Sequence, residues 1–137
     1  PYELPFDDNS FDVVISFGVL EHVSQDFESL KEINRILKKN GLFICLFLPY
    51  FLSWTQPLSK LIGHYYHDKL YSKSQVFSLL ENSNFDLFDI WHRQLLPKNS
   101  IRYPNYQLFE RIDQFLTNYT PLKYFVTNIE FVASKRS

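Results

Sequence analysis

The chain has 137 residues, of which 45% are hydrophobic, and its 14 basic and 15 acidic side chains leave a net charge of −1. This length and balance are typical of one globular domain, and the lack of a basic stripe argues against a nucleic-acid-binding surface. No signal peptide opens the sequence, and no apolar stretch is long enough to predict a membrane span.

Two short apolar runs, at residues 13–17 and 42–48, have the composition of buried strands. Runs with so few polar atoms are typical of parallel sheets whose two faces are both covered by helices. Cys45 lies in the second run, where we expect a buried thiol. Because it is the only cysteine, it has no internal disulfide partner, which fits a reducing cytoplasm.

The segment between these runs predicts a helix near residues 26–38. Ser24 is the expected N-cap, and Lys38 and Lys39 suit the negative end of the helix dipole. Asn40-Gly41 offers a left-handed stop. Strand, helix and strand in this order predict a right-handed βαβ unit with two adjacent parallel strands.

The second half of the chain begins with a sharply marked helix after residue 71. Ser72 and Gln75 have the spacing of a capping box, and Tyr71 and Val76 occupy the positions of a hydrophobic staple. The residues that follow, 85–95, read as a strand.

A further helix and strand are expected near the C-terminus. The helix covers residues 105–119 and places four apolar side chains on one face: Leu108, Ile112, Phe115 and Tyr119. Residues 124–133 alternate with a period of two, which predicts a strand.

Several motifs in this order carry a resemblance to a known family. They are Leu4-Pro5-Phe6 followed by Asp8, the run Ser10-Phe11-Asp12, the triplet Leu20-Glu21-His22, and the stretches "EINRILKKNG" and "HDKLYSKSQVFSLLENSNF". Together they resemble the class I S-adenosylmethionine-dependent methyltransferases, most closely the small-molecule group, over most of residues 3 to 93. Lys39-Asn40-Gly41 stands where that family has Pro-Gly-Gly, and Asn84 stands where it has Gly.

The resemblance implies an α/β, Rossmann-like sheet with strand order 3-2-1-4-5-7-6 and an antiparallel strand 7. Residues 13–17, 42–48, 85–93 and 122–133 would be strands 4, 5, 6 and 7. The glycine-rich turn that follows strand 1 is absent, and the sequence begins at Pro1 rather than at Met. We therefore expect residues 1–137 to be a single partial domain, the C-terminal half of the enzyme.

The resemblance also implies a site at the ends of the strands. His22 is the candidate catalytic residue, as a general base or as a group that orients the acceptor; alternatively it packs against the next helix. The expected cofactor-binding residues are Glu3, Leu4, Ser16, Phe17, Gly18 and Glu21. For several of these, packing of a strand end is the competing interpretation.

The segments 49–71 and 96–121 are the expected acceptor-side insertions. The candidate substrate-pocket residues are Tyr50, Trp54, His64, Tyr65 and His67, although the aromatic ones could equally form the core of a lid. His64 and His67 have metal-compatible spacing, but no third ligand has a convincing position, so the sequence predicts no metal site.

Two functions fit these observations. The first is methyl transfer from S-adenosylmethionine to a small-molecule acceptor, such as a lipid or sugar intermediate. The second is a methyltransferase-like module that binds without catalysis. In both cases the strand at 13–17 lacks a neighbour, so we expect it to pair with a missing N-terminal half or with a second copy of the chain.

Overall fold

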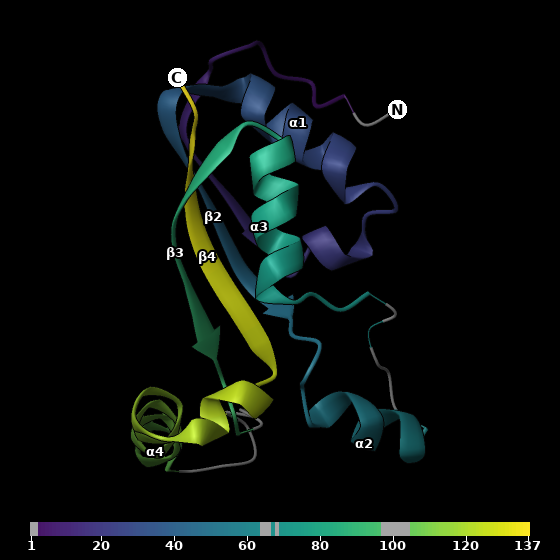
Figure 1. The fold of residues 1–137 in the computed structure, drawn as a ribbon, viewed down its shortest axis with the longest axis vertical. Coiled ribbons are helices and arrows are strands. Elements are labelled where there is room, and N and C mark those ends of the chain that lie inside the picture. Colours follow the sequence, from purple (N-terminus) through teal and green to yellow (C-terminus); the bar gives the residue numbers. More distant parts are fainter. Residues whose placement is uncertain (1–2, 64–66, 68, 97–104) are drawn as a thin grey trace.

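The computed structural model describes residues 3–63, 67, 69–96 and 105–137, which form one mixed sheet with helices packed against it (Figure 1). The strands are β1 (Phe11–Phe17), β2 (Leu37–Pro49), β3 (Phe85–Arg93) and β4 (Asn128–Lys135). The α-helices are α1 (Asp26–Ile36), α2 (Thr55–Leu61), α3 (Lys73–Asn82) and α4 (Tyr106–Tyr119), and two short 3-10 helices are η1 (Leu20–His22) and η2 (Pro121–Phe125). None of the described helices has both the length and the apolar character needed to cross a bilayer.

The sheet has the order β1-β2-β4-β3. β1 runs parallel to β2, with Val13 opposite Leu42 and Phe17 opposite Leu46. β4 is antiparallel to both β2 and β3. The predicted α/β class and parallel pair are thus confirmed, and the neighbours agree with the expected order 4-5-7-6. The places of these strands within a seven-stranded sheet stay a prediction.

The joint between α1 and β2 differs from the prediction. The N-cap is Gln25 rather than Ser24, and α1 ends at Ile36, so Lys38 and Lys39 belong to the strand and not to the end of the helix. The helix ends early because of a tertiary contact. Leu37 adopts an extended conformation, is fully buried and pairs with Phe11 of β1.

The helix stop predicted at residues 40 and 41 is wrong, because α1 ends at Ile36 and both residues lie within β2. Asn40 does take the left-handed conformation, with φ of 60°. Gly41 is needed for space instead, because a Cβ there would lie 2.8 Å from the carbonyl oxygen of Lys38 and 3.2 Å from that of Asp12. Only glycine therefore lets β1 and β2 approach so closely at this point.

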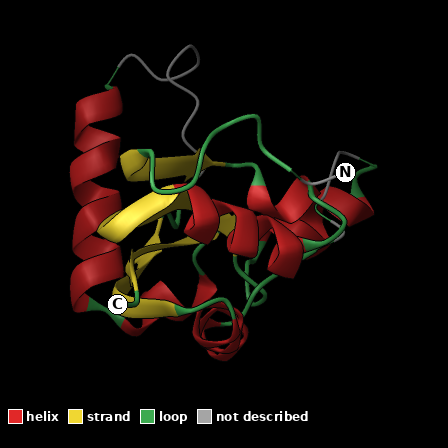
Figure 2. Ribbon diagram, turned by 90° about the horizontal axis from the view of Figure 1, so that it is seen from above, coloured by secondary structure: helices red, strands yellow, loops and turns green. Residues whose placement is uncertain are grey.

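The core lies on one side of the sheet, under α1 and α3 (Figures 1 and 2). Phe43 of β2 is fully buried, and its ring contacts those of Phe85 and Phe131 with centroids 5.8 and 5.6 Å apart. The capping box of Ser72 and Gln75 at the start of α3 is present as predicted.

The C-terminal region departs from the prediction in two places. β3 ends at Arg93, as the family resemblance implied, and not at residue 95, as the residue pattern predicted; Gln94 follows it with a positive φ of 63°. β4 begins at Asn128 rather than 122, because residues 121–125 form η2, whose first turn is capped by the Thr120 hydroxyl accepting from the Leu122 amide.

Helix α4 lies on the side of the sheet opposite α1 and α3 (Figure 2). Its buried residues are polar: the Asp113 carboxylate accepts hydrogen bonds from the backbone amides of Leu95 (2.8 Å) and Leu96 (2.7 Å), and Thr117 is also buried. The four apolar residues share one face, as expected, but that face is exposed. The rotation of α4 thus satisfies the two amides and turns Leu116, which is partly buried, against the core.

Candidate functional site

The strands β1, β2 and β3 all point the same way, so their carboxyl ends meet at one edge of the sheet. Ligands of open α/β sheets bind at this edge. At the end of β1 the chain turns through Gly18, whose φ of 59° favours glycine, and then enters η1. This turn carries Glu21 and His22 to the edge.

A cavity of about 320 Å³ opens beside this turn. It brings together Glu3, Leu4 and Ser16, three of the six residues expected to bind the cofactor. The rest of its wall is formed by Val19, Leu20, Val23, Ser29, Glu32 and Ile33. The other three expected residues lie elsewhere around the turn. Phe17 is exposed, and its ring lies against that of Phe47 at a tilt of 44°. Gly18 forms the turn, and Glu21 lies in η1.

The segment that forms the outer wall is held by Glu32 and Arg35 of α1. The Glu32 carboxylate accepts the amide of Leu4 (3.0 Å), and Arg35 donates to the carbonyls of Leu4 (3.1 Å) and Phe6 (2.8 Å) and to the carboxylate of Asp8 (2.7 Å). Hydrogen bonds from Arg35, and then from the Leu4 amide, hold the pKa of Glu32 below its usual value. Two motifs that are distant in sequence are therefore parts of one network.

Glu21 and His22 form a second group at the same edge, together with His67. The Glu21 side chain is 3% exposed and the His22 side chain 51%, and His22 Nε2 lies 3.8 Å from Glu21 Oε1. The His22 and His67 rings have centroids 5.6 Å apart. The backbone amide of His67 donates to Gln56 Oε1 of α2 (3.0 Å), which fixes this part of the chain beside η1.

The residues expected to line the substrate pocket do not share one place. His67 lies beside His22, but Tyr50 is buried and its ring meets that of His92 at 5.2 Å. Trp54 donates its indole N–H to the carbonyl of Leu95 (2.8 Å). His64 and Tyr65 lie outside the described residues.

Sequence reasoning missed His92, which lies in β3 between the rings of Tyr50 and Tyr124. Burial, reinforced by the charges of Lys73 and Lys123, lowers its pKa to about 4. No spacing in the sequence signals this contact, because it depends on β3 and η2 meeting at the carboxyl edge.

The lowered pKa of His92 predicts a loss of stability in mild acid. The unfolded state, with a pKa near 6.5, binds a proton that the folded state resists until about pH 4. The free energy of unfolding should therefore fall between about pH 6.5 and 4, by about 1–3 kcal/mol after allowance for partial exposure. Urea unfolding at several pH values, compared with His92→Gln, tests this. An equal loss in both proteins would contradict it.

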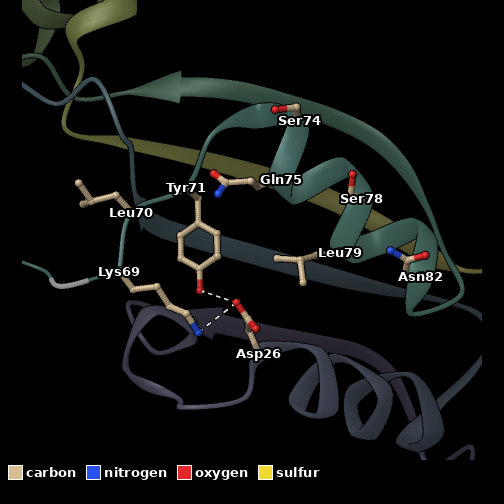
Figure 3. Close-up of a pocket in the computed structure, with 9 residues that line it drawn as sticks. All are labelled: Asp26, Lys69, Leu70, Tyr71, Ser74, Gln75, Ser78, Leu79 and Asn82. Carbon is tan, nitrogen blue, oxygen red and sulfur yellow. Dashed lines mark hydrogen bonds and ion pairs between the residues drawn. The ribbon is translucent and has the colours of Figure 1, made fainter.

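A larger cavity, of about 430 Å³, lies between α1 and α3 (Figure 3). Inside it the Asp26 carboxylate accepts a hydrogen bond from the Tyr71 hydroxyl and pairs with Lys69 Nζ, both at 3.1 Å. Burial by itself would raise the pKa of Asp26, but the hydrogen bonds from Lys69 and Tyr71 outweigh it and lower the pKa. Asp26, Lys69 and Tyr71 thus supply one another's hydrogen-bond and charge partners. Their contacts are best explained as structural, because they hold the segment before α3 against α1.

Comparison with known proteins shows a likeness to methyltransferases. Residues 1–45 match the model of a family described as "Methyltransferase domain". The demethylmenaquinone methyltransferase of Staphylococcus haemolyticus is 39% identical over 95 residues, which are 63% of this chain and 38% of that protein. The enzyme of the same name from Staphylococcus aureus is 40% identical over 91 residues, 61% of this chain and 37% of its own. The chain thus spans well under half the length of these curated relatives.

Solved structures agree on the fold. A methyltransferase from Haloferax volcanii, solved with the Trm112 methyltransferase activator, superposes with a TM-score of 0.63 at 18% identity, covering 97% of this chain and 57% of its own. A SAM-dependent methyltransferase from Thermotoga maritima gives 0.63 at 17% identity, covering 99% of this chain and 60% of its own. With the motifs and the strand order, these matches show that the chain has the fold of S-adenosylmethionine-dependent methyltransferases and is similar in sequence to part of that family.

Proposed function

We propose that the chain is the acceptor-binding, C-terminal half of an enzyme that transfers a methyl group from S-adenosylmethionine to a small molecule. The observation that carries the proposal is the cavity at the carboxyl end of β1, which gathers Glu3, Leu4 and Ser16 within reach of the turn to His22. Residues 49–71 and 96–121, which contain α2 and α4, are proposed as insertions on the acceptor side of this edge.

The cavity suits the adenosine part of the cofactor. Leu4, Val19 and Ile33 provide apolar wall for a flat ring, and the carboxylate of Glu3 and the hydroxyl of Ser16 provide polar partners. S-adenosylmethionine supplies the methyl group on a sulfonium, whose thioether leaves without acid–base help. The protein's task is then to align the acceptor and to exclude water.

His22 is proposed to act on the acceptor. Its side chain is half exposed at the end of β1, beside the buried carboxylate of Glu21. A histidine in this place can take the proton of a hydroxyl acceptor as the new bond to carbon forms. For an acceptor that has no proton to lose, His22 would orient the molecule by a hydrogen bond.

The acceptor is proposed to be a small organic molecule. The curated relatives are named for demethylmenaquinone. A quinone-type molecule is therefore a further candidate acceptor, beside the lipid and sugar intermediates suggested by the sequence. A cytoplasmic site of action stays a prediction, supported by the single free cysteine, Cys45, which is buried.

The cofactor cavity is tested by filling it. Val19→Trp introduces a large ring at an exposed position of the wall, so it should leave the core intact. We expect affinity for S-adenosylmethionine, measured by calorimetry on the full-length polypeptide that contains residues 1–137, to fall at least about tenfold, or 1.4 kcal/mol. Ser78→Trp, which fills the other cavity, is the matched control. Equal affinity in both variants would refute the assignment.

A binding module without methyl transfer is the second candidate. The fold leaves this candidate open, because the [4+2]-cyclase SpnF, which superposes with a TM-score of 0.59 at 16% identity over 98% of this chain, is named for a reaction other than methyl transfer. A fold of this class does not fix the chemistry. Cofactor binding without turnover on any of the acceptor classes above would favour this reading.

A further inference from the structure

Glu21, His22 and His67 offer three metal-binding atoms at one point of the structure. One ligand atom from each residue lies within 4.8 Å of the other two. Glu21 and His22 come from η1, and His67 comes from the chain beyond α2, where its amide is held by Gln56. The sequence pointed to His64 and His67 as a pair without a third ligand; the fold gives His67 two different partners.

The buried carboxylate of Glu21 is the strongest indication of a cation-binding site. Its side chain is 3% exposed, and among the described residues its Oε2 has no hydrogen-bond partner. The charged group found near it is His22 at 3.8 Å, which is positive only when protonated. A buried carboxylate without a counter-charge destabilises the folded state.

Cys45 and Tyr71, two described groups that interact electrostatically with Glu21, supply no positive charge to it. Burial first, and then the charge of Glu21, raises the pKa of Cys45 to about 12. The pKa of Tyr71 is also raised, chiefly by burial and by Asp26, with Glu21 contributing. Lys69 is engaged by Asp26. A bound cation would neutralise Glu21 where these side chains do not.

Two imidazoles and one carboxylate form a known type of catalytic site. This ligand set holds Zn²⁺ in a tetrahedron and leaves the fourth position open. Metal–ligand bonds of about 2.0–2.2 Å place the ligand atoms roughly 3.3 Å apart, so the three atoms, which now lie within 4.8 Å of one another, need to move closer together. The half-exposed side chain of His22 is free to rotate that far.

We propose that Glu21, His22 and His67 bind a divalent first-row cation of the zinc type at the acceptor side of the site. The open position would take an oxygen of the acceptor, so the proposal favours acceptors that carry a hydroxyl or carbonyl oxygen near the methylated atom. This role rests on the proposed methyl transfer, whereas binding of the cation does not.

The test is a titration of the full-length polypeptide that contains residues 1–137 with Zn²⁺ by calorimetry and with Co²⁺ by visible absorption. We expect one cation per chain and the absorption of a tetrahedral Co²⁺ site. Glu21→Gln and His67→Gln should each weaken binding at least about tenfold. Glu28→Gln, the same change at an exposed carboxylate of α1, and His92→Gln should bind as the parent does.

Thermal unfolding with and without Zn²⁺ guards against a variant that simply unfolds, because only proteins with the site should gain stability from the cation. Absence of binding by the parent, or unchanged binding by both Glu21→Gln and His67→Gln, would overturn the proposal. Affinity for S-adenosylmethionine, measured separately, distinguishes the cation site from the proposed methyl transfer. Binding of S-adenosylmethionine without binding of a cation would contradict only the cation site. Binding of a cation without binding of S-adenosylmethionine would contradict only the proposed function.

Discussion

Replacement of His22 by alanine is expected to lower turnover by about 10²- to 10⁴-fold, the usual range for loss of a general base. Affinity for S-adenosylmethionine should change far less, because His22 is not part of the cavity wall gathered around Glu3, Leu4 and Ser16. Since its side chain is half exposed, the substitution should also leave the free energy of unfolding nearly unchanged. Single-turnover kinetics with saturating cofactor separates the chemical step from binding.

The control for this prediction is Lys31→Ala, which removes an exposed side chain from α1 on the same polypeptide and should turn over normally. An unchanged rate of His22→Ala with an oxygen acceptor would remove His22 from the mechanism. A chelator distinguishes the two ways in which His22 can act. If His22 is a base alone, chelation leaves the parent's rate intact, whereas if His22 holds a cation, chelation reproduces the loss seen in the variant.

Local patterns predicted the parts of the fold that local forces determine. The runs at 13–17 and 42–48 became the parallel pair β1 and β2, as apolar runs without polar alternation predict. The expected burial of both faces does not hold for β1, whose outer face is exposed among the described residues. The capping box at Ser72 formed as predicted, because both of its hydrogen bonds close within one turn of the helix.

The errors arose where distant parts of the chain decide the outcome. Helix α1 stops at Ile36 because Leu37 is needed beside Phe11, a contact that helical spacing does not contain. The apolar face of α4 is exposed because Asp113 must reach the amides after β3. The meeting of Glu21 with His67 has the same origin: it requires the turn after β1 and the end of α2 to be placed by the sheet, so residue spacing could not reveal it.

The exposed edge of the sheet leads to the second large expected effect. Among the described residues β1 pairs with β2 alone, so one row of its backbone groups has no strand opposite it. Val13, Ile15 and Phe17 on its outer face are 43%, 61% and 62% exposed. An apolar strand with an open edge recruits another strand, and we propose that further strands of the same methyltransferase domain fill this place in the full-length polypeptide.

Residues 1–137 expressed alone should therefore self-associate through β1. The full-length polypeptide should not associate through this strand. Burial of several hundred Å² of apolar surface contributes roughly 25 cal/mol per Å². The resulting free energy is comparable to the stability of a whole domain, which is about 5–15 kcal/mol. Sedimentation of the isolated chain at several concentrations measures the association. A monodisperse monomer that unfolds cooperatively would show that the edge is closed by the chain's own residues.

A charge at the centre of the edge should reverse the association. Ile15→Lys places an ammonium group on β1, the usual way in which natural edge strands resist pairing. Phe88→Lys is the matched control, since Phe88 is 69% exposed on β3, the opposite edge strand of the same sheet. β3 is already interrupted there by a register shift between Leu87 and Asp89, a bulge that by itself discourages pairing. Loss of association in Ile15→Lys but not in Phe88→Lys would assign it to β1, whereas equal loss in both would assign it to general apolar exposure.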